Sequence, residues 1–180
     1  MVNGWESLSG GGSSILASAH HLLECLSTMT IAHSYNPADG FPQIMPSLRY
    51  GDVAGSLAWL TDAFGFREHL RWTDGNGVVQ HAEMRVGEAF IELSAGSPDH
   101  PTPKALGGVS GALVVMVHDV DSHFARARAR GAVVVAEPED RPWGLRQYTV
   151  EDPDGHRWEF SQFLRHVPPQ DWGATLAAPT

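Results

Sequence analysis

The sequence predicts an α+β fold made of two tandem βαβββ modules. The first observation behind this prediction is an internal repeat, in which residues of one type recur 67 positions apart (119 − 52, 159 − 92 and 161 − 94): Asp52 and Asp119, Glu92 and Glu159, and Ser94 and Ser161. The second is that each copy of the repeat places one helical pattern before three strand-like segments. A repeat of two units sets the architecture, and it can place paired residues on either side of a shared cleft.

The first module opens with an extended segment at residues 43–50. Asp52 is a residue type that caps the start of a helix, and the apolar pattern of 53–63 predicts that helix. Gly65 then ends it, because glycine accepts the left-handed conformation common at helix C-termini. Three extended segments follow, separated by turn sequences, at residues 67–73, 78–86 and 89–94.

The second module repeats this order. A strand is predicted at 112–117, and a helix begins after Asp119 and ends at Gly131. Three strands follow, the last two joined by the turn sequence Asp-Pro-Asp-Gly, at residues 133–136, 146–150 and 156–160.

These elements divide the chain into five parts. Residues 1–40 form an amino-terminal arm, helical or partly disordered, that contains a flexible glycine-serine linker. The two modules span 41–96 and 110–164, with a proline- and glycine-rich linker at 97–109 between them. A polar tail occupies 165–180.

Composition limits the partners and the compartment. The 180 residues carry 12 Lys and Arg against 21 Asp and Glu, a formal net charge of −9. Such a surface repels phosphate backbones and anionic lipids, so it argues against nucleic acid and membrane partners and suits a cationic ligand. The single cysteine, Cys25, excludes an internal disulfide. No stretch reaches the roughly 18 to 20 apolar residues of a membrane helix, and we expect a cytoplasmic protein.

Three features carry a resemblance to a known family: the tandem βαβββ units, the phrase Glu-Asp-Pro-Asp-Gly-His-Arg-Trp-Glu-Phe at 151–160, and the helix closure Ala-Phe-Gly-Phe at 63–66. Together they resemble the vicinal oxygen chelate superfamily, which includes glyoxalase I, bleomycin-resistance proteins and extradiol dioxygenases. The resemblance covers roughly residues 43–163. It implies that each module is half of an open, incompletely closed barrel around a central cleft. Because one such scaffold hosts many chemistries, the fold is better specified than the activity.

The resemblance also identifies candidate site residues. In metal-dependent members of the superfamily, the first and last strands of each module supply one metal ligand apiece. The last-strand positions match Glu92 and Glu159 in this chain. Strand alternation supports this independently, because the flanking apolar residues would face the helices and direct both glutamates into the cleft: Ile91, Leu93, Trp158 and Phe160.

The first-strand positions depart from the family pattern. They hold Met45 and Ala112, and a neutral thioether suits Mg, Mn or Ni poorly while alanine offers no donor. We therefore predict no metal ligands and no cofactor in this cleft. Two further residues, Gln43 and His81, could supply metal ligands, so binding of a divalent metal stays an open alternative. His81 could equally pack within the sheet.

Without a metal, two carboxylates that face one cleft need another role. Glu92 and Glu159 could act as general base and acid, and we take them as the candidate catalytic residues. They could also bind a cationic ligand, pair with a neighbouring arginine, or be purely structural.

Three other residues are candidate ligand contacts. Phe90 shares its strand face with Glu92, while Trp143 and Arg146 lie in a loop and strand that edge the ligand cleft in similar non-glyoxalase proteins of the family. Trp143 could stack on a planar ligand and Arg146 could orient an anionic group, or the loop could simply cover the sheet. Trp59 and Trp72 are assigned to the core or to an interface.

The sequence therefore predicts a glyoxalase- or bleomycin-resistance-like protein that binds a small organic molecule in the cleft between modules, without a metal. The alternative is a metal-dependent lyase, isomerase or dioxygenase of the same superfamily, and a third possibility is a metal-free enzyme. The expected partners are a small-molecule ligand and a second copy in a homodimer, with the modules pairing within one chain or across two.

Overall fold

The computed structural model describes residues 42–178, and the statements below concern that part of the chain. The chain divides into two units, Met1–Gln43 and Ile44–Thr180, and the fold described here is that of the second. The arm predicted at 1–40 lies outside the described residues. None of the described helices is long and apolar enough to span a membrane.

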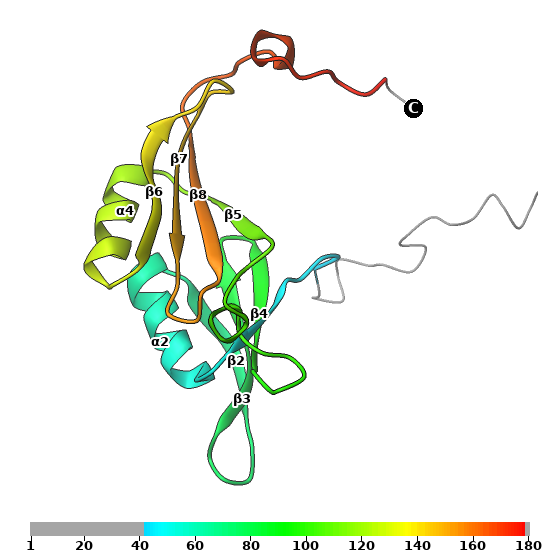
Figure 1. Ribbon diagram of the computed structural model, residues 1–180, viewed down its shortest axis with the longest axis vertical. Helices are drawn as coiled ribbons and strands as arrows, with labels where there is room; N and C mark the ends of the chain where they lie inside the picture. Colours follow the sequence, from blue (N-terminus) through cyan, green and yellow to red (C-terminus); the bar gives the residue numbers. More distant parts are fainter. Residues whose placement is uncertain (1–41, 179–180) are drawn as a thin grey trace, which may run out of the picture. The chain divides into compact units, whose positions relative to one another are not determined.

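The first module forms a four-stranded mixed sheet, sheet 1, with one helix (Figure 1). Its strand order is β1-β4-β3-β2, in which β1 runs parallel to β4 and the other neighbours are antiparallel. The elements are β1 (Ser47–Tyr50), α2 (Val53–Phe64), β2 (Arg67–Thr73), β3 (Val79–Val86) and β4 (Ala89–Ala95).

The second module forms sheet 2 in the same way, with the order β5-β8-β7-β6 and β5 parallel to β8. Its elements are β5 (Ala112–Met116), α4 (Val120–Ala129), β6 (Val133–Asp140), β7 (Leu145–Glu151) and β8 (Arg157–Phe163). The short helix α3 (Pro103–Leu106) lies between the modules in sequence, and a 3₁₀ turn (Pro169–Trp172) follows β8. The α+β fold of two tandem βαβββ modules is confirmed, and the two described sheets do not close into a barrel.

The predicted helix boundaries depend on identifiable caps. Asp52 accepts a hydrogen bond from the Gly55 amide at the start of α2, and Gly65 ends that helix with φ 77°. Asp119 accepts one from the Ser122 amide at the start of α4. The offset of the repeat is therefore visible in the helix starts as well as in the strands.

One strand is shorter than predicted. The sequence indicates an extended segment from residue 43, whereas β1 begins at Ser47. Pro46 has no amide hydrogen and cannot donate to a strand ladder. It still accepts through its carbonyl oxygen, 2.8 Å from the Glu92 amide. As a result β1 pairs only with residues 92–95 of β4.

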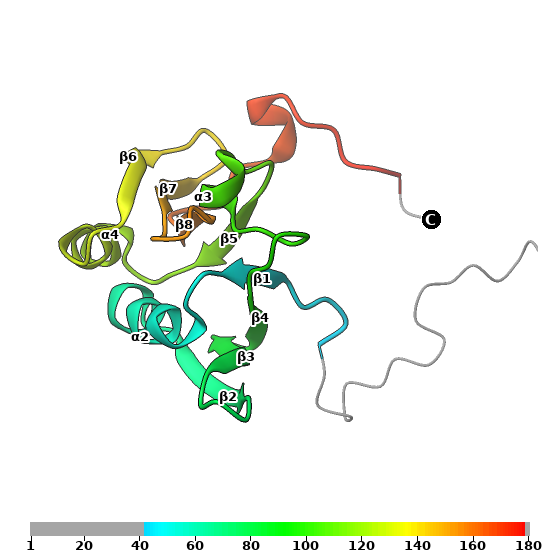
Figure 2. The same cartoon turned by 60° about the horizontal axis from the view of Figure 1, so that its bottom comes forward.

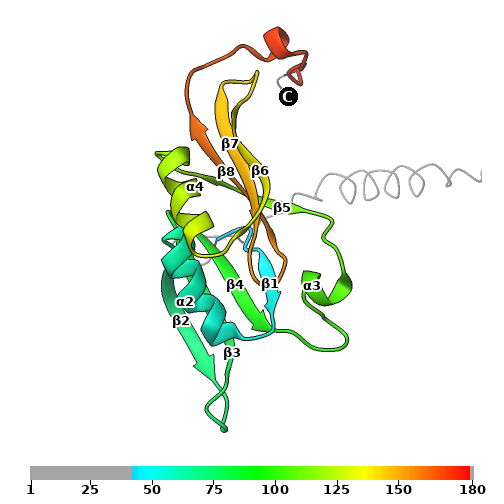
Figure 3. The ribbon, with the colours of Figure 1, turned by 60° about the vertical axis from the view of Figure 1, so that its left-hand side comes forward.

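The two modules pack through the faces of their sheets that carry the helices. The ring of Phe64, at the end of α2, lies 5.6 Å from that of Trp158 and 4.7 Å from that of Phe160, both on β8. Helices α2 and α4 lie side by side (Figures 2 and 3). Between them, Arg126 donates through Nε to the Ala63 carbonyl at 3.0 Å. One apolar core therefore serves both modules.

A buried polar cluster forms a second link between the modules. The Tyr50 hydroxyl donates to Asp152 at 2.9 Å, and the Trp158 indole donates to the same carboxylate at 3.1 Å. His156 Nε2 lies 2.7 Å from the Arg49 carbonyl oxygen. Burial raises the pKa of Asp152 and that of Tyr50.

This packing leaves the other face of each sheet outside the shared core. We call it the open face. Strand alternation places Glu92 on the open face of sheet 1, between buried Ile91 and Leu93. The same alternation places Glu159 on the open face of sheet 2, between buried Trp158 and Phe160. The predicted orientation of these apolar neighbours toward the helices is consistent with their burial.

Candidate functional site

Glu92 is held by hydroxyl groups of its own sheet. Ser47 and Ser94 both donate to Glu92 Oε1, at 3.1 and 2.8 Å. His81 Nδ1 lies 3.6 Å from the same oxygen, and the two side chains are 34% and 25% exposed. These four residues form a polar cluster on the open face of sheet 1, in which His81 and Glu92 are partly exposed to solvent.

Glu159 is held separately in sheet 2. The Gln147 amide nitrogen lies 2.7 Å from Glu159 Oε1 and 2.8 Å from the Ser161 hydroxyl. Gln147 and Ser161 are buried, whereas Glu159 is half-buried. Within the described residues no contact joins Glu159 to Glu92. Each glutamate belongs to the open face of its own module.

The strand register identifies the residues beside each glutamate. Ser47 is the β1 partner of Glu92, and Val114 is the β5 partner of Glu159. Met45 precedes β1, and Ala112 is paired with Arg157 instead. Across residues 42–178, no group of three or more His, Cys, Asp or Glu side chains is placed to hold a metal ion. Among the described residues, a serine and a valine therefore occupy the strand positions beside the two glutamates.

Arg146 lies on the helix-covered side of sheet 2. Its guanidinium donates twice to Asp121 of α4, at 2.8 and 3.0 Å, and once to Asp140 of β6, at 2.7 Å. These hydrogen bonds to two carboxylates raise the pKa of Arg146. The charge of Arg146 is therefore engaged in fixing α4 to sheet 2.

Trp143 lies just before β7 and is 39% exposed. Its ring packs edge-on against Trp172 of the carboxy-terminal segment, with centroids 6.2 Å apart. Phe90, the third predicted ligand contact, lies on the open face of sheet 1. It contacts His69 edge-on at 5.0 Å and lies beneath the Arg85 guanidinium at 5.1 Å. The structure does not bring these three residues together.

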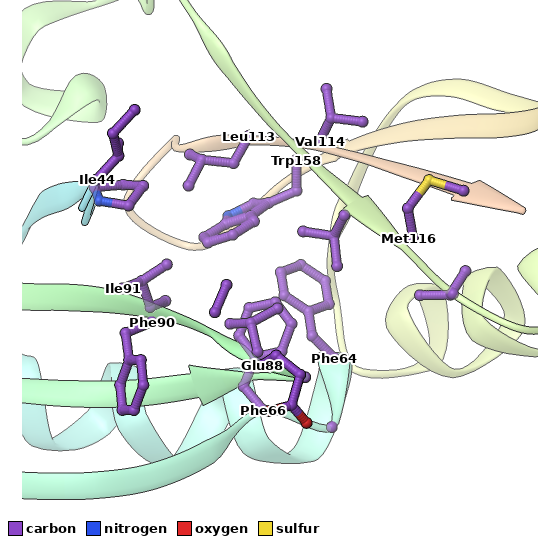
Figure 4. A pocket seen from close by; sticks show the side chains of 17 residues that line it. Ile44, Phe64, Phe66, Glu88, Phe90, Ile91, Leu113, Val114, Met116 and Trp158 are labelled. Carbon is purple, nitrogen blue, oxygen red and sulfur yellow. The ribbon is translucent and has the colours of Figure 1, made fainter. Parts of the chain in front are cut away.

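An apolar groove of about 660 Å³ lies between the modules (Figure 4). Of the predicted site residues, Phe90 lines this groove. The other four do not: Glu92, Trp143, Arg146 and Glu159. It follows the edge of β5 that has no strand neighbour among the described residues. Three apolar side chains of its lining are strongly exposed: Ile44 at 83%, Val114 at 62% and Met116 at 57%.

Of the two assignments that the sequence leaves open for Trp72, the core or an interface, the structure excludes the core. This residue is 57% exposed and lies opposite His81 in the β2–β3 pairing, so it is an open-face residue rather than part of the core. The register of β2 and β3 shifts between Trp72 and Thr73, so counting from the hairpin turn at 74–77 does not give the partner of Trp72. Trp59 is half-buried against Phe64, with ring centroids 5.0 Å apart.

Comparison with known proteins gives consistent results. A family model described as Glyoxalase/Bleomycin resistance protein/Dioxygenase superfamily matches residues 40–160. An uncharacterized protein of Mycobacterium bovis is 34% identical over 131 residues, which is 70% of this chain and 86% of the relative. Two uncharacterized proteins from strains of Mycobacterium tuberculosis are also 34% identical, over 77% of their length.

Among solved structures, TioX from Micromonospora sp. ML1 is 36% identical, with a TM-score of 0.55, covering 67% of this chain and 98% of that one. A glyoxalase/bleomycin resistance protein/dioxygenase family enzyme from Burkholderia phytofirmans PsJN is 18% identical, with a TM-score of 0.52 over 66% of this chain and 95% of that one. The second similarity concerns the fold alone.

Proposed function

The chain belongs to the Glyoxalase/Bleomycin resistance protein/Dioxygenase superfamily, and from this premise we propose that it binds a small organic molecule in a cleft between two modules. The observation that carries the proposal is the packing of Phe64 against Trp158 and Phe160. Because the helix-covered faces of both sheets are buried in this core, a ligand would bind to the open faces of sheets 1 and 2. Each carries a half-buried glutamate among hydrogen-bonding side chains.

A second copy of the chain completes the cleft. In a two-fold dimer, sheet 1 of one copy faces sheet 2 of the other, so that Glu92 and Glu159 from different chains flank one ligand. An unpaired apolar strand edge is a ready site for association. The exposed Val114 and Met116 of β5, which line the same groove as Ile44, support this edge as the contact between copies.

Binding rather than metal chemistry is the proposed role. A serine and a valine occupy the strand positions beside the glutamates, and neither is a ligand preferred by hard divalent ions. The two carboxylates recognise donor groups of the guest. Trp143 adds an exposed ring at the cleft's edge, and Arg146 positions that hairpin through Asp121 and Asp140.

The test combines oligomeric state with ligand binding. Sedimentation velocity of the full chain is expected to give a dimer, and calorimetry against a panel of planar organic compounds, cationic, neutral and anionic, is expected to find ligands. Met116→Lys places a charge on the β5 edge and should give monomers that no longer bind. Val78→Lys is the matched control, since Val78 is 52% exposed outside the groove. A monomeric Met116→Lys that binds normally would place the cleft within one chain, and a panel without ligands would refute the binding role.

A further inference from the structure

Four residues form a row across the open face of sheet 1, one from each strand. Trp72 of β2 is opposite His81 of β3, His81 is opposite Ser94 of β4, and Ser94 is opposite Arg49 of β1. Partners in register point to the same face of a sheet. With strands about 4.8 Å apart, the row extends about 14 Å from Trp72 to Arg49. An aromatic ring, an imidazole, a hydroxyl and a guanidinium thus follow one another in a line.

The two ends of the row are available for a ligand. Trp72 is 57% exposed, which is unusual for a residue of this size unless it contacts something outside the chain. Arg49 is half-buried, and none of the ion pairs within residues 42–178 involves it. Its carbonyl is fixed by His156, so the backbone that carries the guanidinium is anchored.

The middle of the row is held in place by Glu92. The Ser94 hydroxyl donates to Glu92 at 2.8 Å, and His81 Nδ1 lies 3.6 Å from the same carboxylate oxygen. Glu92 therefore orients the Ser94 hydroxyl from the neighbouring row, accepts a second hydrogen bond from Ser47, and has the imidazole of His81 beside it. His81 Nε2 has no hydrogen-bond partner among the described residues, and this leaves it for a polar group of a ligand.

We infer that this row binds a one- or two-ring aromatic acid, with the ring on Trp72 and its carboxylate or other acidic oxygen at Arg49. The inference rests on the proposed function, because it names the guest of the same cleft. Tryptophan offers a flat face for stacking, and an arginine fork matches a carboxylate in two hydrogen bonds. The local chemistry thus selects an anionic guest although the net charge of the chain is −9. The carboxylates of Glu83 and Glu92 in the next row would repel a second acidic group on the guest and so limit its charge.

The experiment compares two probes of one shape, naphthalene-2-carboxylate and naphthalene-2-carboxamide, by calorimetry with the full chain. The carboxylate is expected to bind more tightly. Arg49→Gln should weaken the carboxylate about tenfold, the loss of one charge-assisted contact, and leave the amide unchanged. Trp72→Ala should weaken both probes several-fold. Arg128→Gln, an exposed arginine of α4 outside the row, is the control for lost charge.

Unchanged thermal unfolding of each variant is required for these comparisons. The inference is overturned if the two probes bind equally well, or if Arg49→Gln leaves the affinity for the carboxylate unchanged. In either case the proposed function stands. If neither probe binds but other planar compounds of the panel do, the inference is again wrong and the cleft has another guest. If neither the two probes nor any compound of the panel binds, the proposed function fails as well.

Discussion

The hydroxyl of Tyr50, at the end of β1, donates a hydrogen bond to the carboxylate of Asp152, 2.9 Å away and 102 positions later in the chain. Both side chains are buried, at 1% and 3% exposure. The same carboxylate also accepts from the Trp158 indole and from the amides of Asp154 and His156. It is therefore a hub that joins the first module to the turn before β8.

Asp152→Ala is expected to destabilise the protein by roughly 3 to 5 kcal/mol, because several buried donors would lose their acceptor. Tyr50→Phe removes a single hydrogen bond to the carboxylate and should cost about 1.5 to 3 kcal/mol. Urea unfolding measures both free energies, with the exposed Asp171→Ala as control. A cost for Asp152→Ala no larger than for the control would show that the cluster does not join the modules.

His123 should make stability depend on pH. Its Nε2 lies 3.1 Å from the Phe64 carbonyl oxygen and its Nδ1 is bonded to the Tyr148 hydroxyl, so the neutral ring serves as one donor and one acceptor. Burial lowers the pKa of His123 in the folded chain. The unfolded chain then binds more protons, so the stabilisation is present above the unfolded pKa and is lost as pH falls through the folded pKa.

Wild type is accordingly expected to lose stability from about pH 6.5 downward, and His123→Gln should lose less over the same range because the glutamine amide does not titrate. Unfolding midpoints in urea across pH 5 to 8 measure the difference between the two proteins. Parallel pH profiles would contradict the assignment of His123 as a buried neutral ring.

Gly144 and Gly173 offer a matched pair of substitutions, because both have φ 88°. A Cβ at Gly144 would lie 2.1 Å from the Arg165 carbonyl oxygen, whereas nothing lies within 4 Å of one at Gly173. Gly173→Ala should cost only the left-handed strain, about 1 to 2 kcal/mol. Gly144→Ala should cost roughly 1 to 3 kcal/mol more, since the backbone must move. Equal unfolding free energies for the two variants would refute the close approach.

Metal content tests the binding role directly. After dialysis against trace Mg, Mn, Ni and Zn, elemental analysis of the purified protein is expected to find less than one ion per chain, because the neighbours of Glu92 and Glu159 are Ser47 and Val114. One tightly held ion per chain that disappears in Glu159→Ala would instead support the metal-dependent class of enzyme.

Trp143→Ala should weaken the binding of planar ligands several-fold, since an aromatic contact contributes about 0.5 to 1.5 kcal/mol beyond buried area. Its partner ring, Trp172, supplies the control: Trp172→Ala removes their mutual packing but leaves Trp143 to the ligand. A lower melting temperature for Trp143→Ala with unchanged affinity would show that the ring is structural.

The repeat was sufficient to predict the modules, because hydrogen bonding inside each one is local and periodic. Asp52 and Asp119 cap their helices as expected, and Glu92 and Glu159 are placed equivalently by the same register. What the repeat does not contain is the contact between modules. The choice of the helix-covered faces for that contact depends on the aromatic side chains of Phe64, Trp158 and Phe160, which periodicity alone treats as ordinary core residues.

The candidate site was harder to predict for a related reason. The engagement of Arg146 by Asp121 and Asp140 depends on side chains from α4 and β6, which no spacing along the chain relates to one another. The row that includes Trp72 and Arg49 crosses all four strands of sheet 1. It requires the register of three separate pairings to be known together.

The packing of Phe64 against the second module couples the folding of the two modules. Phe64 ends α2, yet its ring is covered by β8, nearly a hundred positions away in the sequence. A chain that stopped after β4 would leave this ring in water and would lack the partner of Tyr50. Although the two modules repeat the same order of elements, neither is a complete folding unit. Heat or denaturant should therefore melt them in a single cooperative transition rather than one after the other.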